Sequence, residues 1–156
     1  MKKLLLISSE GGHLSELLQL EDTFTDYDYH LVTEKTPTTS FLKNTYPHKV
    51  TYLPYGTQDH LLPYLLIFPY NILKSLFIFL IKRPDVVITT GTHTAVPMCY
   101  IAHFFKKRVI YIETFASVKK PSKAGKLVYK MADLFVVQWE ELLAIYPDAV
   151  YWGWIY

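Results

Sequence analysis

Short apolar runs recur along the chain and alternate with segments that have helical spacing or polar composition. Strands buried between two layers of helices are continuously apolar, because helices cover both of their faces. On this criterion strands are predicted over residues 3–8, 29–33, 49–53, 85–89, 108–112 and 134–137. Helices are predicted over residues 14–22, 94–105, 125–132 and 140–146, and polar loops over 34–46 and 117–125. This alternation predicts an α/β fold built on a doubly wound, Rossmann-like parallel sheet.

The segment 61–81 is the most apolar part of the chain and joins the strands predicted at 49–53 and 85–89. Its length and apolarity approach those of a transmembrane helix. A single crossing, however, would place two strands of one sheet on opposite sides of the bilayer. We therefore predict a crossover helix that is apolar almost all round. Its polar stripe is formed by Asn71, Lys74, Ser75 and Lys82.

A crossover helix needs only one apolar face, so the surplus apolar surface of 61–81 is expected to contact something other than the sheet. Our preferred interpretation is an interfacial helix that lies on a membrane. In that interpretation Phe68, Phe77 and Phe79 insert among the lipids, and Lys82 and Arg83 meet anionic headgroups. The alternative is burial in an interface with a second copy or another subunit.

Composition fits one globular domain spanning residues 1–156. The chain has 156 residues, a net charge of +2 and 51% hydrophobic residues, which excludes an intrinsically disordered chain. Cys99 is the only cysteine, so an internal disulfide and a cysteine-based zinc site are excluded. Because Cys99 falls inside an apolar helical segment, it is predicted to be a core residue rather than a nucleophile.

Positive charge is concentrated between residues 106 and 130, where Glu113 is the only acidic residue. Such a cluster suits phosphate groups or anionic lipid, although a solvated surface is the simpler interpretation. No nucleic-acid recognition motif accompanies it, so nucleic acid is not expected as a partner. The basic residues are Lys106, Lys107, Arg108, Lys119, Lys120, Lys123, Lys126 and Lys130.

The turn after the first predicted strand carries the first candidate site. Gly11 and Gly12 would let the backbone approach a ligand closely, and the following helix would begin beside it. His13 would then lie at the carboxyl edge of the sheet, where it could deprotonate a hydroxyl or bind a phosphate. A helix cap with an incidental histidine is the alternative. The turn lacks the third glycine of a dinucleotide fingerprint and the Gly-Lys-Ser/Thr of a P-loop.

A second loop of similar character, with Thr90, Gly91, Thr92 and His93, follows the strand at 85–89. Both loops end parallel strands, so they should open on the same edge and bind one substrate together. Glu113, at the end of the next strand, is expected to join them as a catalytic base or a ligand of sugar hydroxyls. Its alternative role is an ion pair with a neighbouring lysine. The six histidines lack the spacing of metal ligands, so neither a metal nor a cofactor is expected.

Several short motifs together resemble the PssD-type subunits of bacterial polysaccharide glycosyltransferases. These subunits are similar to the membrane-anchoring subunit of the eukaryotic UDP-GlcNAc transferase of dolichol-linked oligosaccharide synthesis. The resemblance covers nearly the whole chain, and the combination of motifs is more specific than any single one. The motifs are Ser-x-Gly-Gly-His at 9–13, Thr90-Gly91, the run 111–114, Gly125-Lys126, Gln138-Trp139, Tyr146-Pro147 and Gly153.

The resemblance implies the amino-terminal half of a GT-B glycosyltransferase such as MurG. That half holds a lipid-linked acceptor and touches the membrane, while a separate partner supplies the nucleotide-sugar-binding half. It further implies that the loop 11–13 lies near the acceptor diphosphate or hydroxyl, and that Thr90, Gly91 and Glu113 line the cleft.

We therefore expect a peripheral subunit at the cytoplasmic face of the cell membrane, active only with its partner. Together they would transfer a sugar from a UDP-sugar to a polyprenyl-diphosphate-linked acceptor in capsular or exopolysaccharide synthesis. The alternative is a non-catalytic scaffold that recruits and activates the partner. Aromatic residues near the carboxyl terminus are expected to dock the partner or, alternatively, to pack on the chain's own sheet. The docking residues are Trp152, Trp154, Ile155 and Tyr156.

Overall fold

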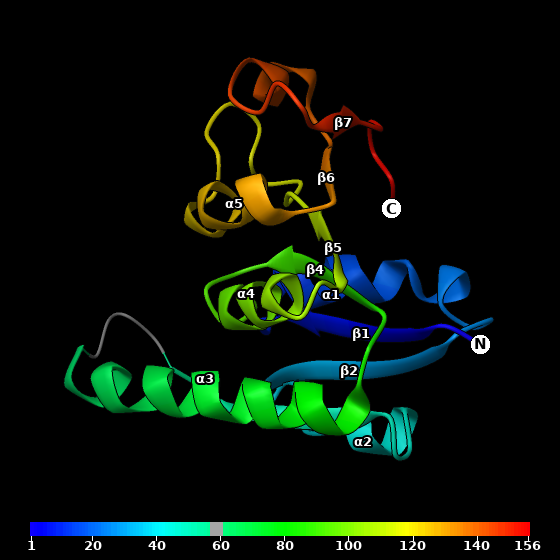
Figure 1. Ribbon diagram of the computed structural model, residues 1–156, viewed down its shortest axis with the longest axis vertical. Helices are drawn as coiled ribbons and strands as arrows, with labels where there is room; N and C mark the ends of the chain where they lie inside the picture. The colour runs from blue at the N-terminus through cyan, green and yellow to red at the C-terminus, as the bar shows by residue number, and fades with distance from the viewer. Residues whose placement is uncertain (57–60) are drawn as a thin grey trace.

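The computed structural model describes residues 1–56 and 61–156, with side chains described outside residues 61–65. Its centre is an all-parallel sheet with strand order β3-β2-β1-β4-β5-β6-β7 (Figure 1). Because the strand order reverses between β1 and β4, the predicted doubly wound parallel sheet is confirmed. The strands are β1 Lys3–Ser8, β2 Asp28–Lys35, β3 Val50–Pro54, β4 Val86–Gly91, β5 Arg108–Ile112, β6 Leu134–Val137 and β7 Val150–Tyr151.

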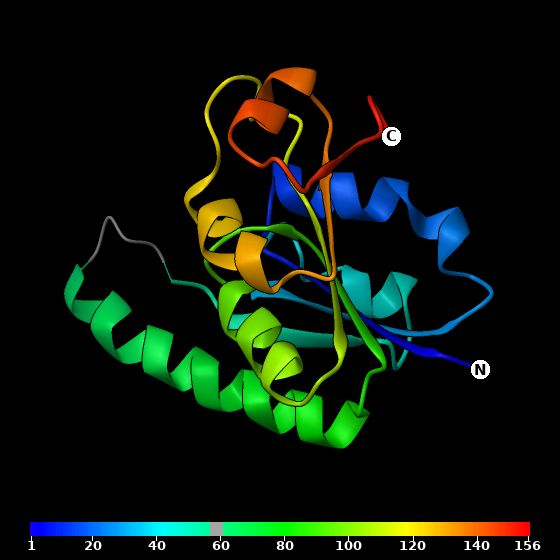
Figure 2. The same cartoon turned by 45° about the horizontal axis from the view of Figure 1, so that its top comes forward.

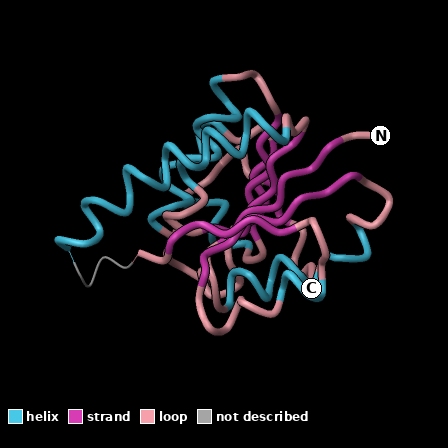
Figure 3. Tube along the Cα trace, turned by 90° about the horizontal axis from the view of Figure 1, so that it is seen from below, coloured by secondary structure: helices cyan, strands magenta, loops and turns pink. Residues whose placement is uncertain are grey.

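Helices cover both faces of the sheet (Figure 3). One face carries α1 Gly12–Gln19 and α2 Leu42–Thr45, and the other carries α3 Leu61–Lys82, α4 Val96–Phe104 and α5 Lys123–Val128. On the second face α3, α4 and α5 follow one another across the sheet, and the first turns of α3 extend beyond it (Figure 2). The short 3₁₀ turns are η1 Glu21–Thr23, η2 Tyr129–Met131 and η3 Glu140–Ala144.

The predicted elements are found, with differences that have local causes. In place of the helix predicted over 140–146 the chain forms the 3₁₀ turn η3, and α2 lies within the segment predicted as a loop. Strand β7 has only two residues, both exposed, so no apolar run in the sequence predicts it. Helix α5 begins earlier than predicted because the Ser122 hydroxyl accepts a hydrogen bond from the backbone N–H of Gly125, which caps the helix.

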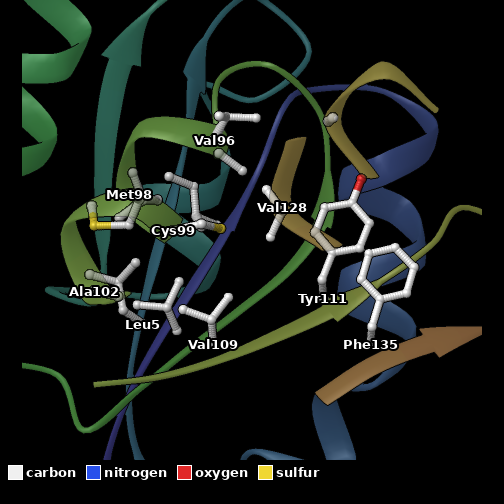
Figure 4. Packing of buried hydrophobic residues seen from close by; sticks show 14 of the residues in the cluster. Leu5, Val96, Met98, Cys99, Ala102, Val109, Tyr111, Val128 and Phe135 are labelled. Atoms are coloured by element: carbon white, nitrogen blue, oxygen red, sulfur yellow. The ribbon is translucent and has the colours of Figure 1, made fainter. Parts of the chain in front are cut away.

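The core between the sheet and α4 is close-packed (Figure 4). Met98, Cys99 and Ala102 on α4 are fully buried against the sheet. The ring of Tyr111 stacks on that of Phe135, with centroids 4.9 Å apart. Burial raises the pKa of the Cys99 thiol to about 12, so little reactive thiolate forms at neutral pH. The prediction that Cys99 is a core residue is confirmed.

Helix α3 is oriented with part of its polar stripe toward the protein. Asn71 and Ser75 are buried, and the Asn71 Nδ2 donates a hydrogen bond to the Pro54 carbonyl at 3.0 Å. Asn71 thereby satisfies a carbonyl at the end of β3, and the small Ser75 fits beneath the helix. Because the polar side chains point inward, much of the apolar side of α3 is left exposed.

The prediction that Phe79 belongs to the exposed surface is wrong. Phe79 is only 4% exposed and packs against Phe105, with ring centroids 5.2 Å apart. Phe68 is half-buried, whereas Phe77 is 64% exposed as expected. Phe79 is buried because α4 packs against α3 there, a contact that no pattern within residues 61–81 encodes.

Exposed apolar side chains of α3 are joined by others from the end of α4. We call this surface the apolar face: Leu66, Tyr70, Leu73, Phe77, Leu80, Ile81, Tyr100, Phe104 and Phe105. Large apolar side chains exposed in this number on two neighbouring helices suit contact with a membrane or a partner. Within the described residues, no helix combines the length and apolarity that crossing a bilayer would need.

The basic segment 106–130 is divided between opposite edges of the sheet. Residues 106–108 lead into β5 at the amino edge, where the Lys107 ammonium pairs with Asp85 at 3.1 Å. Lys119, Lys120 and Lys123 follow the carboxyl end of β5 instead. The sequence cluster is therefore two separate basic regions, because the whole length of a strand lies between them.

Candidate functional site

The two glycine- and histidine-containing loops meet at the carboxyl edge of the sheet, as predicted. The His13 Nδ1 lies 2.8 Å from the Thr90 carbonyl oxygen, and the Thr90 hydroxyl donates to the His13 carbonyl at 2.6 Å. The Ser9 N–H donates to the Gly91 carbonyl at 3.2 Å. These reciprocal bonds join β1–α1 and β4–α4 into one rigid unit.

The contact with Thr90 determines which nitrogen of His13 is available for chemistry. A carbonyl oxygen can only accept, so the His13 Nδ1–H is the donor in this bond. In the neutral ring the Nε2 then carries the lone pair and can accept a proton or a hydrogen bond. His13 is thus held as a base, and its ring lines a cavity.

This cavity has a volume of about 370 Å³ and lies at the carboxyl edge, where ligands of open α/β sheets bind. The β1 and β4 loops supply one wall, with His13, Thr92 and His93. Tyr111 and the start of α5 supply the rest, through Ser122, Lys123, Ala124 and Leu127. Thr90 and Gly91 are buried and support the wall through His13 rather than lining the cavity.

Two glycines are required by the backbone at this edge. Gly11 and Gly91 have φ values of +81° and +100°, which side chains with a Cβ rarely adopt. A Cβ on Gly91 would also lie 3.1 Å from the Tyr111 hydroxyl and 3.5 Å from the His13 ring. Gly12 is exposed, and a Cβ there would meet nothing within 4 Å.

His93 lies on the same wall, but its ring is already engaged. Its Nε2 lies 3.1 Å from the Gly56 carbonyl oxygen, to which it must donate. Its Nδ1 lies 3.4 Å from the Thr92 hydroxyl. His93 is therefore suited to shaping the wall, whereas His13 is better placed to accept a proton.

Glu113 does not reach the cavity, and the expectation that it acts as a base or contacts sugar hydroxyls is corrected. Its carboxylate is fully buried and accepts from the Thr114 N–H at 3.1 Å. It also accepts from the backbone N–H and hydroxyl of Ser122, at 3.2 and 3.1 Å. Burial raises the pKa of this carboxyl, and the bonds from Ser122 and Thr114 oppose that rise. The side chain fixes the loop that leads into α5.

Nor does Glu113 form the ion pair that was its alternative role. Among the described residues, the structure has one ion pair, between Lys107 and Asp85. Glu113 forms no ion pair because its buried carboxylate is surrounded by hydroxyl and amide donors, whereas the neighbouring lysines are exposed to solvent.

Replacing Gly125 by alanine is expected to destabilise the protein. Alanine has the higher helix propensity, but a Cβ at residue 125 would overlap the Glu113 carboxylate and lie 2.9 Å from Ser122 Oγ. Overpacking of this kind costs about 1–3 kcal/mol, so Gly125→Ala should lower the melting temperature by several degrees. Gly12→Ala is the matched control because its Cβ enters open space. Equal melting temperatures for the two variants would contradict the role given to Glu113.

Glu34 is a site residue that sequence reasoning missed. It is 2% exposed, and its Oε1 accepts from the Thr94 hydroxyl at 2.6 Å while its Oε2 accepts from the Glu10 N–H at 3.3 Å. Burial raises the pKa of its carboxyl. Glu34 thus ties the end of β2 to the loops after β1 and β4. A polar residue at the end of a buried strand was the available signal, but the strand was predicted to end at residue 33.

Glu16 on α1 is a second missed residue and anchors the carboxyl-terminal tail. Its Oε1 accepts from the Thr114 hydroxyl at 2.8 Å, and its Oε2 accepts from the Tyr156 hydroxyl at 3.3 Å. Ile155 packs against the core on the α1 side. These two tail residues therefore follow the alternative prediction and pack on the chain itself.

Trp152 and Trp154 remain available on the surface, at 54% and 72% exposed. Trp154 contacts the ring of Phe115, which also packs against Trp139. The tail is therefore held to the protein by Glu16, and its two tryptophans are exposed to solvent.

No group of three or more potential metal ligands comes together among the described residues. His60 lies outside those residues. The cavity wall itself offers imidazole, hydroxyl and ammonium groups. Such groups suit phosphate and sugar hydroxyls.

Comparison with known families gives a match over most of the chain. The model described as "Oligosaccharide biosynthesis protein Alg14 like" matches residues 64–155. The UDP-N-acetylglucosamine transferase subunit alg14 of Schizosaccharomyces pombe is 31% identical, over 97% of this chain and 82% of the relative. The corresponding mouse subunit is 27% identical over the same shares. The expected similarity to the eukaryotic subunit is confirmed, and the resemblance to PssD-type subunits stays a prediction.

Among solved structures, MurG of Acinetobacter baumannii has a similar fold, with a TM-score of 0.73 and 11% identity. The match covers 90% of this chain but only 43% of MurG. The chain therefore corresponds in fold to one Rossmann-like half of a GT-B enzyme, as expected for the amino-terminal half.

Proposed function

Since this chain belongs to the Alg14-like family of oligosaccharide biosynthesis proteins, we propose that it is the acceptor-binding subunit of a two-component glycosyltransferase. In this proposal residues 1–156 form one half of a GT-B-type site, and a separate subunit supplies the nucleotide-sugar-binding half. The donor is a UDP-sugar, and UDP-N-acetylglucosamine is the first to test because the relatives are named for it. The acceptor is a sugar linked to a polyprenyl diphosphate.

The observation that carries this proposal is the orientation of His13 in the cavity. With Nδ1–H bound to the Thr90 carbonyl, Nε2 is the acceptor for the proton of an attacking hydroxyl. As the hydroxyl oxygen bonds to the anomeric carbon, the bond from that carbon to the UDP oxygen breaks and UDP leaves with the electron pair. The proton passes to His13 Nε2 and is released to solvent before the next turnover.

We place the reaction at a membrane because the apolar face needs a partner and a polyprenyl acceptor is itself a lipid. The face consists of large apolar side chains, and the exposed Arg83 directly follows α3, as basic residues do on interfacial helices. Lys82 is half-buried and lines a pocket with His30 and His48 instead. The cytoplasmic leaflet is the proposed location, since nucleotide sugars are made in the cytoplasm. On the resemblance to PssD-type subunits, the product would be a repeat unit of a capsular or extracellular polysaccharide.

Docking of the donor-binding subunit is assigned to the exposed tryptophans of the tail. Trp152 and Trp154 are the kind of side chain that anchors protein interfaces. Both tryptophans belong to a tail that is bound to Glu16, and Glu16 also accepts from Thr114 in the loop after the carboxyl end of β5. A subunit bound there would lie at the same edge of the sheet as the cavity that it has to complete.

Reconstitution tests the proposed function. This chain, its partner subunit and the assembled complex are each incubated with UDP-N-acetylglucosamine and membrane-extracted polyprenyl-diphosphate acceptors, and lipid-linked sugar is measured. We expect transfer by the complex and none by either subunit alone.

The double variant Trp152→Ala, Trp154→Ala should lose co-purification with the partner while keeping its melting temperature.

The same assay distinguishes a catalytic half-site from a scaffold. If the partner alone, in detergent with soluble acceptor, turns over as fast as the complex, this chain only recruits it. If the complex transfers no sugar from any UDP-sugar, the proposed function is wrong.

A further inference from the structure

We propose that α5 binds the two non-sugar parts of the acceptor. Lys123 binds the diphosphate, and Leu127 contacts the first part of the lipid chain. This inference rests on the proposed function and assigns the acceptor's orientation within the cavity. Both side chains line the cavity, opposite the wall that carries His13. They are four residues apart on one helix and therefore project from the same side of it.

Lys123 has the charge and the freedom to bind a diphosphate. It is exposed at the cavity, and no carboxylate lines that cavity among the described residues. The acidic residue of its own segment, Glu113, is buried and committed to Ser122 and Thr114. Lys119 and Lys120 add positive charge to the preceding loop, so an anion entering here meets attraction without a competing acid.

The position of Lys123 is fixed by the residue before it. The backbone N–H and the hydroxyl of Ser122 both donate to Glu113, and Ser122 Oγ accepts from the Gly125 N–H at 2.9 Å. The buried carboxylate thus anchors the first turn of α5 against β5. Glu113 is therefore a positioning residue, and the backbone from which the Lys123 side chain projects is held in place.

Leu127 connects the cavity with the apolar face. It is 54% exposed, and its carbonyl accepts from the Tyr100 hydroxyl at 3.3 Å. Tyr100 and Phe104 are exposed on α4, which packs between α3 and α5. Figures 1 and 2 both show these three helices in sequence on one face of the sheet. Exposed apolar side chains therefore extend from α3 over α4 to the mouth of the cavity.

Apolar side chains lead here to Lys123 and to His13, which is placed to accept a proton. This arrangement fits an amphiphile whose lipid chain is followed by an anionic group and then by a hydroxyl. A prenyl chain would lie on the Tyr100–Leu127 side, its diphosphate at Lys123, and the sugar hydroxyl at His13. A free nucleotide would leave the apolar part of this surface uncovered.

The test uses the assembled complex and two acceptors, one with a long polyprenyl chain and one with a short, water-soluble chain. Lys123→Ala removes the charge-assisted hydrogen bond to the diphosphate, so it should raise KM for both acceptors about tenfold or more, with kcat little changed. Leu127→Ser should raise KM about tenfold for the long-chain acceptor only. Lys126→Ala is the control, because this exposed lysine lies on the same helix but does not line the cavity.

Binding of the short-chain prenyl diphosphate to the complex, measured by calorimetry without donor, gives a readout that is independent of turnover. Weaker binding by Lys123→Ala supports the inference even if the transferred sugar is misidentified. Unchanged KM and binding in an active complex overturn it while leaving the proposed function intact. Equal loss of vesicle binding and acceptor affinity in Lys123→Ala would also overturn it, because the lysine would then contact lipid headgroups rather than substrate.

Discussion

Replacing His13 by alanine is expected to lower kcat of the assembled complex about a hundredfold or more, the usual contribution of a general base. The expectation follows from the bond between His13 Nδ1–H and the Thr90 carbonyl, which leaves Nε2 as the proton acceptor in the cavity. KM for the acceptor should change much less than kcat, because the base acts mainly in the transition state. Single-turnover measurement on lipid-linked acceptor would separate the chemical step from product release.

Two comparisons make the result for His13 specific. His48→Ala, at the opposite edge of the sheet before β3, should leave kcat unchanged. Co-purification of His13→Ala with the partner should equal that of the wild type, since docking is assigned to Trp152 and Trp154 and not to the residues that line the cavity. A fall in kcat below roughly threefold would make His13 a structural residue and leave the proposed mechanism without a base.

Replacing three residues of the apolar face by serine is expected to abolish binding to anionic vesicles. In the variant Leu73→Ser, Phe77→Ser, Phe104→Ser, each side chain loses about 1 kcal/mol or more of insertion free energy. The combined loss corresponds to a decrease in the partition coefficient of roughly a hundredfold or more. Co-sedimentation with vesicles of phosphatidylcholine and phosphatidylglycerol measures it. The three side chains are exposed, so the melting temperature should not fall.

Charge and position provide the controls for membrane binding. Arg83→Glu should weaken binding to anionic vesicles by roughly 1 kcal/mol, the contribution of one basic residue near the surface. Phe41→Ser should have no effect, because Phe41 is 55% exposed but adjoins α2 on the other face of the sheet. Wild-type protein that stays in the supernatant, with and without its partner, would show that the apolar face has another occupant.

The sheet and the convergence of its two loops could be predicted from sequence because both depend on local pattern. Continuously apolar runs identify buried strands, and alternation with helices makes the strands parallel. Loops after parallel strands then have to open on one edge, which is where His13 and Thr90 meet. The convergence of the loops depends on strand direction and not on any side-chain contact, so it can be predicted even where the ends of the strands are misplaced by several residues.

Side-chain roles at the same edge were predicted less well because they depend on burial. Glu113 and His13 both follow strands, and both are residues that carry out acid–base chemistry. In the structure His13 lines the cavity, whereas Glu113 lies behind the wall beneath Ser122 and Gly125. Which of two polar residues faces a ligand is decided by the packing of α5, and residues far apart in the chain determine that packing.

The sequence by itself determined the parallel α/β fold, the edge that carries the candidate site and the presence of surplus apolar surface in residues 61–81. Only the tertiary structure decided where that surface points. Asn71 and Ser75 turn inward under α3, Phe79 is covered by α4, and the apolar face continues onto α4 instead. It also separated the basic residues of 106–130 onto two edges. Periodicity fixes which residues share a side of a helix, but the rotation of that helix against the sheet is set by the free energy of packing the whole core.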